Sequence, residues 1–426
     1  MKRSIVDKLK NRRNIIDKFY VSDNRVVYTP SFMVERIFDE FPKNIWKNPN
    51  FTWCDPATKS GEFLIGVIIR LMNGLEDVIK DEKKRFDHII KNMVYGYAVD
   101  VVSALISRKT IYNSPYTKGN IFDYSFIEKE ERKDMKKFDI EVGNPPFQEP
   151  STKERKGGSP KTIWPKFLYI GLDYLADGGY LALIHPCGWR KPSVENKKEP
   201  SLYSILTKYQ IEWLEQHKSD GGRESGMQTF GVGTSFDCYV LHKVPYTKPT
   251  FVSDFSGKDY PKIDLREWEK LFHGLPSGEF ELIKSMLVKD GEETWDVRHD
   301  SLYLVNRKTP RIKDNIFKYP IINTIDANGK NIAYANTNKR GNSHFGVPKV
   351  IISDGRHIYP IADFEGKYGM SQNAIGFVVK TKKEMNNLIA FLNSSEFKKV
   401  VWATKWGNFR TDWRMFKYFK KSLYAN

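Results

Sequence analysis

Apolar residues from about position 28 to position 245 follow two alternating patterns. Short apolar, β-branched runs are typical of buried strands, and longer stretches in which apolar residues return every three or four positions are typical of amphipathic helices. The predicted strands are 51–55, 93–100, 119–123, 138–142 and 179–186, and the predicted helices are 61–75, 101–112 and 162–176. Because strands that alternate with helices form mostly parallel sheets, this pattern predicts a doubly wound α/β domain.

The pattern differs on either side of this region. Residues 1–27 are rich in charge and predict a helical leader, whereas residues 28–245 carry the strand-helix alternation. Residues 246–426 spread prolines, glycines, aromatics and lysines without clear alternation. We therefore expect a domain boundary near 245 and a separate C-terminal α+β domain.

The charge balance narrows the class of partner. The chain carries 69 Lys and Arg against 52 Asp and Glu, a net charge of +17, which favours nucleic acid or an acidic membrane surface. The longest apolar run, 63–72, contains Arg70 and is too short for a membrane span, and the N-terminus has no signal-peptide core. Cys54, Cys187 and Cys238 are isolated, which indicates a reducing compartment and predicts no metal site. Nucleic acid is thus the expected partner, in the cytoplasm.

Polar residues follow four of the predicted strands. Asp55, Asp100, Asp123 and Asn144 lie at or just past strand ends. Ligands of open α/β sheets bind beyond the carboxyl ends of the strands, so these residues predict a shared crevice, although each Asp alone could equally be a helix cap. The turn after Asp55 contains Gly61 but lacks the glycines and the Lys-Ser/Thr pair of a phosphate cradle, which indicates a ligand without a triphosphate.

The strand at 138–142 leads into Asn144-Pro145-Pro146-Phe147, where the prolines end the ladder because they lack an N–H. The exocyclic amine of a nucleobase is a poor nucleophile, since its lone pair is delocalised into the ring. The Asn144 side-chain carbonyl and the Pro145 backbone carbonyl could accept its two hydrogens, while Phe147 offers a face for stacking. A sulfonium methyl group is already activated, so positioning could suffice for direct transfer.

These residues carry a family resemblance. Residues 144–147 resemble the [DNS]-P-P-[YFW] motif of S-adenosylmethionine-dependent N6-adenine DNA methyltransferases from restriction-modification systems, and 55–64 resemble their D-P-x-x-G-x-G-x-F cofactor motif. Lys59 stands where the family has its first glycine, so the turn departs from the pattern there. Residues 27–39 resemble the preceding motif, and the motif order is that of the γ group. The resemblance covers 28–245.

The resemblance implies a Rossmann-like, seven-stranded class I methyltransferase sheet whose last strand lies within 236–243, and S-adenosyl-L-methionine as cofactor. The implied catalytic residues are Asn144, Pro145, Pro146 and Phe147. The implied cofactor-binding residues are Thr29, Pro30, Asp55, Pro56, Ala57, Gly61, Phe63, Asp100, Val101, Asp123 and Asn144. Phe147 and Phe230 are implied to stack on a flipped adenine, with Phe236 as the competitor for the second position.

Two basic stretches are candidates for DNA contacts. The polar, basic loop 148–166 follows the Pro-Pro element and should be mobile, and the stretch 401–421 of the expected target-recognition domain interleaves aromatic and basic residues. The candidate DNA-binding residues are Lys153, Arg155, Lys156, Lys405, Arg410 and Arg414. The aromatics of the second stretch are equally typical of a domain core. A weaker candidate is 353–360.

The implied function is site-specific methylation of adenine N6 in double-stranded DNA, by a monomer from a prokaryote or a virus, with any cognate restriction endonuclease encoded separately. RNA adenine methylation, protein glutamine methylation and a non-catalytic DNA-recognition subunit remain as alternatives. A cytosine-C5 mechanism would need a Pro-Cys nucleophile. Cys187 follows a later strand, while 144–147 occupy the relevant loop, so we interpret Cys187 as structural.

Overall fold

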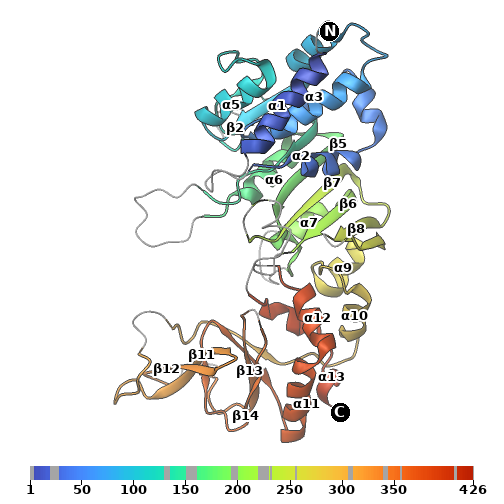
Figure 1. The fold of residues 1–426 in the computed structure, drawn as a ribbon. Helices are drawn as coiled ribbons and strands as arrows, with labels where there is room; N and C mark the ends of the chain where they lie inside the picture. The colour runs from blue at the N-terminus through green and yellow to red at the C-terminus, as the bar shows by residue number, and fades with distance from the viewer. Residues whose placement is uncertain are drawn as a thin grey trace. The chain divides into compact units, whose positions relative to one another are not determined.

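The computed structural model of the protein describes residues 4–19, 28–128, 135–149, 161–192, 200–218, 230, 233–254, 257–305, 310–338, 344–355, 357–406 and 410–425. The chain forms two compact units (Figure 1). The first comprises 1–187 and 200–265, and the second comprises 188–199 and 266–426.

The first unit is built on one large mixed sheet. Among the described residues, nine strands follow the order β3-β2-β1-β4-β5-β7-β6-β8-β9. The five neighbouring strands β3, β2, β1, β4 and β5 are parallel to one another. The next strand, β7, is antiparallel to both of its neighbours, β5 and β6. The strands are β1 (Trp53–Thr58), β2 (Val94–Ala98), β3 (Ile121–Phe122), β4 (Phe138–Gly143), β5 (Leu175–Pro186), β6 (Tyr209–His217), β7 (Phe236–Pro245), β8 (Thr250–Asp254) and β9 (Asp259–Ile263).

Helices pack around this sheet and build its core. The helix α3 is apolar and buried over most of its surface, because it contacts β1 and β2 as well as α1, α2 and α5. The helices of the unit are α1 (Ile5–Phe19), α2 (Ser31–Asp39), α3 (Glu62–Gly74), α4 (Glu82–His88), α5 (Val101–Tyr112), α6 (Trp164–Tyr174) and α7 (Leu202–Leu206), with the short η1 (Lys43–Lys47), η2 (Ile89–Met93) and η4 (Cys187–Arg190).

The α/β prediction is confirmed, since every predicted strand and helix overlaps an observed one. The predicted leader helix is α1, and residues 20–27 lie outside the described residues. In the described residues, however, the sheet has nine strands where seven were expected, and it continues past the expected boundary near 245. The proline-rich link 245–249 is a turn between β7 and β8, and the Gln210 side chain holds it by accepting from the N–H groups of Thr247 and Lys248 at 3.0 and 3.1 Å.

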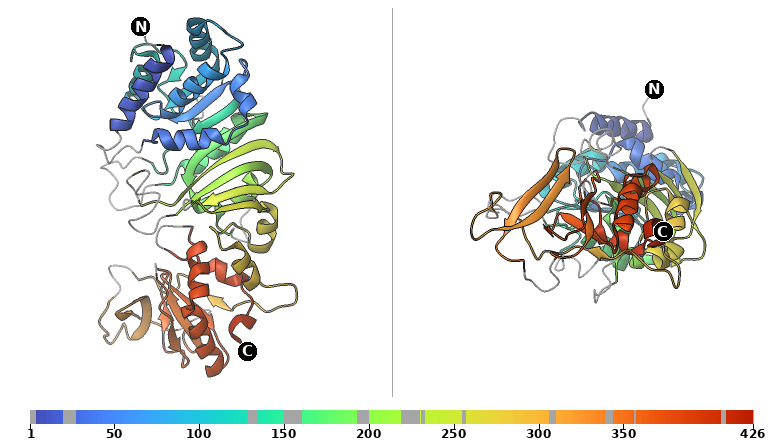
Figure 2. Two further views of the ribbon diagram at one scale, coloured as in Figure 1. Left: turned by 45° about the vertical axis from the view of Figure 1, so that its right-hand side comes forward. Right: turned by 90° about the horizontal axis from the view of Figure 1, so that it is seen from below.

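The second unit is α+β. In its described part, β10-β16-β13-β14 form one sheet and β12-β11-β15 another. Figure 2 shows the β11–β12 hairpin projecting from the rest of the unit. The strands are β10 (Val297–Arg298), β11 (Tyr319–Asp326), β12 (Gly329–Ala335), β13 (Lys349–Ser353), β14 (Ile361–Asp363), β15 (Gly369–Met370) and β16 (Ala374–Val378). The helices are α9 (Leu265–Phe272), which begins at the division, α10 (Phe280–Met286), α11 (Lys382–Asn393), α12 (Ser395–Ala403), η5 (Trp413–Tyr418) and α13 (Ser422–Ala425).

An aromatic cluster forms the core of the second unit. Trp295 stacks on Phe397 and Phe416 with ring centroids 5.6 Å apart in both cases, and Phe416 is fully buried. Among the described helices of either unit, none has the length and apolar composition of a membrane span.

Candidate active site

The parallel pairing of β1 with β4 brings two of the predicted polar strand ends together. Cys54 lies opposite Glu141 in this register, so Asp55 and Asn144 follow at the same edge of the sheet. A Cβ atom at Gly143 would lie only 2.9 Å from Asp55 Oδ1. Gly143 therefore lets the end of β4 pass directly beside the Asp55 carboxyl, which a larger residue would displace.

Asn144 is held by a side chain from a distant segment. Its amide Nδ2 donates to Thr29 Oγ1 at 3.1 Å, across 115 residues of sequence, and both side chains are buried. Thr29 precedes Pro30, the residue that caps α2. Because the hydrogen bond to Thr29 uses an amide hydrogen, it fixes the orientation of the amide group and leaves the carbonyl oxygen as an acceptor.

Glu62 connects the same segment to the turn after β1. Its Oε1 accepts from the Thr29 N–H at 3.3 Å and its Oε2 from the Ser60 N–H at 3.0 Å. Glu62 is buried and is the first residue of α3, where the helix dipole favours a carboxylate. Sequence reasoning missed this residue. The only signal was an acid directly after Gly61.

Local contacts hold the end of β1 and the turn that leads from it to α3, in which Lys59 stands. Asp55 Oδ1 accepts from the Ala57 N–H at 3.0 Å, and Gly61 adopts a left-handed φ of +83°. Burial raises the pKa of the Asp55 carboxyl to about 8. The hydrogen bond from the Ala57 N–H and the charge of Lys59 both lower this pKa, whereas the charge of Glu62 raises it further. A cationic ligand group near Asp55 would therefore favour ionisation of this carboxyl.

Asp100 and Asp123 extend the edge beyond Asp55, because β2 and β3 follow β1 in the sheet order. Asp100 is exposed and caps α5, accepting from the Ser103 N–H at 2.7 Å and from Ser103 Oγ at 3.0 Å. The next residue, Val101, is 57% exposed although it is apolar. Asp123 is partly exposed and lies 3.4 Å from an Arg108 guanidinium nitrogen. The helix-cap interpretation of Asp100 thus holds, and its exposed carboxylate also remains accessible to a ligand.

The aromatic residues differ in exposure. Phe147 is partly buried against the main apolar core of the unit, which includes Phe230, and its carbonyl accepts from the Ile163 N–H at 3.1 Å. Phe230 is buried and packs edge-on against Phe236 with ring centroids 4.8 Å apart, and Phe236 is fully buried. The other predicted residues of the turn and loop, Pro56, Phe63 and Pro145, are buried, and Pro146 is half-buried.

The predicted DNA-binding residues differ in whether the structure describes them and in how exposed they are. Lys153, Arg155 and Lys156 lie outside the described residues. Lys405 is buried and donates to the Gly355 carbonyl at 3.3 Å, and the partly buried Arg414 pairs with Asp412. Arg410 has a 68% exposed side chain that lies 3.4 Å from Asp354.

The aromatics of the 401–421 stretch mostly form core, which is the alternative that the sequence left open. Trp406, Phe416 and Phe419 are buried, whereas Trp402 is partly exposed. Because these aromatics are buried, the basic residues between them are held close to the core, where Lys405 and Arg414 contact other protein groups. Of the three predicted basic residues in this stretch, only Arg410 is therefore largely exposed.

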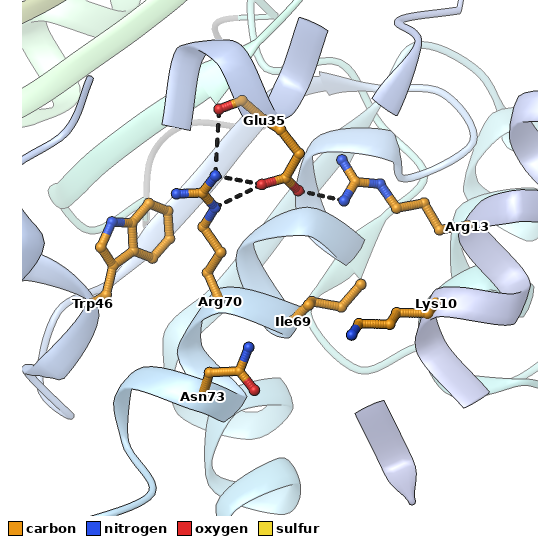
Figure 3. Close-up of a pocket in the computed structure, with 7 residues that line it drawn as sticks. All are labelled: Lys10, Arg13, Glu35, Trp46, Ile69, Arg70 and Asn73. Carbon is orange, nitrogen blue, oxygen red and sulfur yellow. Dashed lines mark hydrogen bonds and ion pairs between the residues drawn. The ribbon is translucent and has the colours of Figure 1, made fainter. Parts of the chain in front are cut away.

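A cavity of about 540 Å³ lies elsewhere in the first unit (Figure 3), lined by Lys10, Arg13, Glu35, Trp46, Ile69, Arg70 and Asn73. None of these residues belongs to the predicted cofactor set. Figure 3 shows the Glu35 carboxylate between the guanidinium groups of Arg13 and Arg70, with which it forms ion pairs. This network ties α1 and α3 to α2.

Comparisons with known proteins agree with the motif-based resemblance. Residues 60–220 match the Eco57I restriction-modification methylase family. The resemblance to restriction-modification methylases is therefore confirmed. An "uncharacterized adenine-specific methylase" from Mycoplasma pneumoniae (strain ATCC 29342 / M129) is 24% identical over 237 residues. That match covers 39% of this chain and 56% of the relative, so the chain spans little more than half of the relative's length.

Solved structures of restriction-modification enzymes share the fold of nearly the whole chain. The ATP-dependent Type ISP enzyme LlaBIII bound to DNA matches 97% of this chain and 39% of its own, with a TM-score of 0.56 and 11% identity. The Type IIL enzyme MmeI in complex with DNA matches 99% of this chain and 65% of its own, with a TM-score of 0.51 and 11% identity. At these identities the likeness concerns the fold alone.

Proposed function

We propose that the chain is a site-specific DNA methyltransferase that transfers a methyl group from S-adenosyl-L-methionine to adenine N6. The observation that carries the proposal is the buried Asn144 amide, anchored on Thr29 beside the Asp55 turn and followed by two prolines and a phenylalanine. The family match over residues 60–220 supports the same reaction class.

The strand edge suits S-adenosylmethionine. The exposed Asp100 carboxylate can accept hydrogen bonds from ribose hydroxyls, and the exposed Val101 beside it offers an apolar contact for the adenine ring. The left-handed Gly61 permits close backbone approach, and a cationic ligand group near the buried Asp55 would favour ionisation of its carboxyl. Thr29, Pro30, Pro56, Ala57, Phe63 and Asp123 complete the proposed binding set. When bound, this cofactor supplies an activated sulfonium methyl group.

The residues of the loop would position the acceptor base. Asn144 Oδ1 and the Pro145 carbonyl would accept hydrogen bonds from the two amine N–H groups, which directs the nitrogen lone pair toward the methyl donor. On methylation the amine loses one of these protons to solvent. The bond from Asn144 to Thr29 holds the amide in place before the base arrives, so little reorganisation is needed during transfer. Phe147 stacks on the flipped adenine and Phe230 flanks it. Flipping itself costs about a few kcal/mol.

The proposed setting is a restriction-modification or viral protection system, in the cytoplasm of a prokaryote or of a virus-infected cell. The partner is double-stranded DNA bound by a monomer, with a cognate endonuclease, where one exists, on a separate chain. The net charge of +17 favours DNA over a protein glutamine substrate. A non-catalytic recognition subunit would not need the anchored Asn144.

The test is expression of the full chain in a host that lacks adenine methylation, followed by sequencing of genomic DNA with single-base modification detection. We expect N6-methyladenine at one short sequence, and a much lower methylated fraction from an Asn144→Ala variant produced at the same level. Tritiated methyl transfer to DNA, RNA and a glutamine-containing peptide then separates the alternatives. Unmodified DNA, with cofactor binding intact, would overturn the proposal.

A further inference from the structure

Three buried side chains with metal-binding atoms meet where β6 and β7 pair. Glu215 and His217 lie two positions apart on β6, so they face the same side of the sheet. Cys238 lies directly opposite Glu215 in the antiparallel register. None of the three belongs to the proposed catalytic or cofactor-binding set.

The donor atoms lie close enough together to share one metal ion. His217 Nε2 lies 2.8 Å from Glu215 Oε1 and 3.8 Å from Cys238 Sγ, and Cys238 Sγ lies 4.0 Å from Glu215 Oε1. Zinc bonds of about 2.0–2.3 Å to nitrogen, oxygen and sulfur in tetrahedral geometry place ligand atoms roughly 3–4 Å apart. A bound ion would therefore require only small shifts of these side chains.

Neighbouring residues hold the donors in this arrangement. Arg36 of α2 donates to Glu215 Oε2 at 3.0 Å, which leaves Oε1 directed at His217. Burial alone would raise the pKa of the Glu215 carboxyl, but His217 and Arg36 more than offset this effect and keep the pKa below its usual value. The His217 ring stacks on Phe236 with centroids 4.2 Å apart. Such supporting contacts orient metal ligands in proteins.

We propose that Glu215, His217 and Cys238 bind one divalent ion of the zinc class. A nitrogen, a thiolate and a carboxylate together are typical zinc ligands, and three protein donors leave the fourth position of a tetrahedral ion to a water molecule. The ion would join the end of β6 to the start of β7 and fix Phe236, on which Phe230 packs. The competing explanation is a Glu-His hydrogen bond beside an inert cysteine.

The first test measures metal content. The full chain is expressed with added zinc, dialysed extensively and analysed by mass spectrometry for metals. We expect about one zinc per chain, and background levels in Cys238→Ser and His217→Gln variants. Cys187→Ser is the matched control, because Cys187 is also a buried cysteine of the first unit but lies outside the cluster. It should retain the metal.

The second test identifies the ligand and does not depend on the folding of a variant. Wild-type protein stripped with a chelator and reloaded with Co²⁺ should show thiolate-to-cobalt charge-transfer absorption in the near ultraviolet, which the control keeps and Cys238→Ser loses. Wild-type protein without this band, or with zinc no higher than in Cys238→Ser, would overturn the proposal. Equal metal loss from Cys187→Ser and Cys238→Ser would do the same.

Discussion

The proposed chemistry can be tested at a single side chain, that of Asn144. Replacing it with alanine removes an acceptor that is needed mainly in the transition state, so we expect methyl transfer to fall roughly 10²- to 10³-fold with little change in cofactor affinity. Tritiated methyl transfer and titration calorimetry measure the two effects. Asn144→Asp keeps an acceptor oxygen and should retain more activity than alanine. Near-normal turnover of Asn144→Ala would contradict the role.

Asp100 requires a variant that separates its two roles. Alanine would remove both the helix cap and the proposed ribose contact, whereas serine can still accept from the Ser103 N–H. We therefore expect Asp100→Ser to keep the melting temperature but to weaken S-adenosylmethionine binding by about 1–3 kcal/mol, from lost hydrogen bonds to a charged acceptor. Calorimetry and thermal unfolding test this. An unchanged dissociation constant would leave Asp100 as a cap only.

At this scale the sequence predicted Asn144 and Asp55 because each lies in a motif at a predicted strand end, although β1 continues past Asp55 to Thr58. It could not predict Glu62 as the link to Thr29, which lies 33 residues away, because an acid in a first helical turn is ordinary. Nor could it show that Lys405 is buried and that Arg414 is partly buried in an ion pair with Asp412. Their spacing suits both a DNA-binding face and a core, and only the packing of the aromatics decides between them.

Among structural elements, the turn between β1 and α3 depends on Glu62. Glutamine keeps one acceptor oxygen but presents an NH₂ group to the second N–H donor, either that of Ser60 or that of Thr29. We expect Glu62→Gln to lower the free energy of unfolding by about 1–3 kcal/mol and to weaken cofactor binding. Chemical denaturation and calorimetry measure these effects. The control is Glu76→Gln, at an exposed position just beyond α3, and an equal response of both variants would contradict the prediction.

The strand β4 carries a fully buried acid. Glu141 has no hydrogen-bond partner among the described residues, and its Oε2 lies 2.7 Å from the position that a Cβ on Gly171 would occupy. Burial raises the pKa of the Glu141 carboxyl well above its usual value, with Lys243 opposing the rise. Above pH of about 4.3 the unfolded chain therefore releases this proton while the folded protein keeps it, so Glu141 destabilises the fold increasingly as pH rises.

We therefore expect Glu141→Met, a substitution of similar volume, to be more stable than wild type, by a margin that grows from pH 5 to pH 8. Urea denaturation at several pH values measures the margin. A difference in unfolding free energy that stays constant across this range would show that the carboxyl is ionised in the folded protein.

The strand β6 is one of the elements that the hydrophobic pattern did not predict. Its apolar alternation is interrupted because Glu215, Gln216 and His217 are polar yet buried. A half-buried strand normally keeps polar residues on its exposed face, so periodicity could not identify this one. The residues that obscured the strand include two members of the proposed metal site.

For the whole molecule, the net charge of +17 predicts DNA binding that weakens steeply with salt, because each phosphate contact releases counterions. Arg410 is exposed, so Arg410→Ala should reduce the slope of log association constant against log salt by about one. Arg414→Ala is the matched control, since the pairing of Arg414 with Asp412 predicts a loss of stability and an unchanged slope. A slope near zero for wild type would exclude phosphate contacts.

The two edge strands of the nine-stranded sheet, β3 and β9, determine whether the sheet can pair with a strand of another copy of the chain. A strand at a sheet edge exposes unpaired N–H and C=O groups and can recruit another chain. Here β3 has only two residues, and β9 carries Pro261, which lacks an N–H, followed by the exposed Lys262. Neither edge is a good template for strand addition, so the large sheet should resist fibre-like self-association even at the high concentrations used for crystallisation.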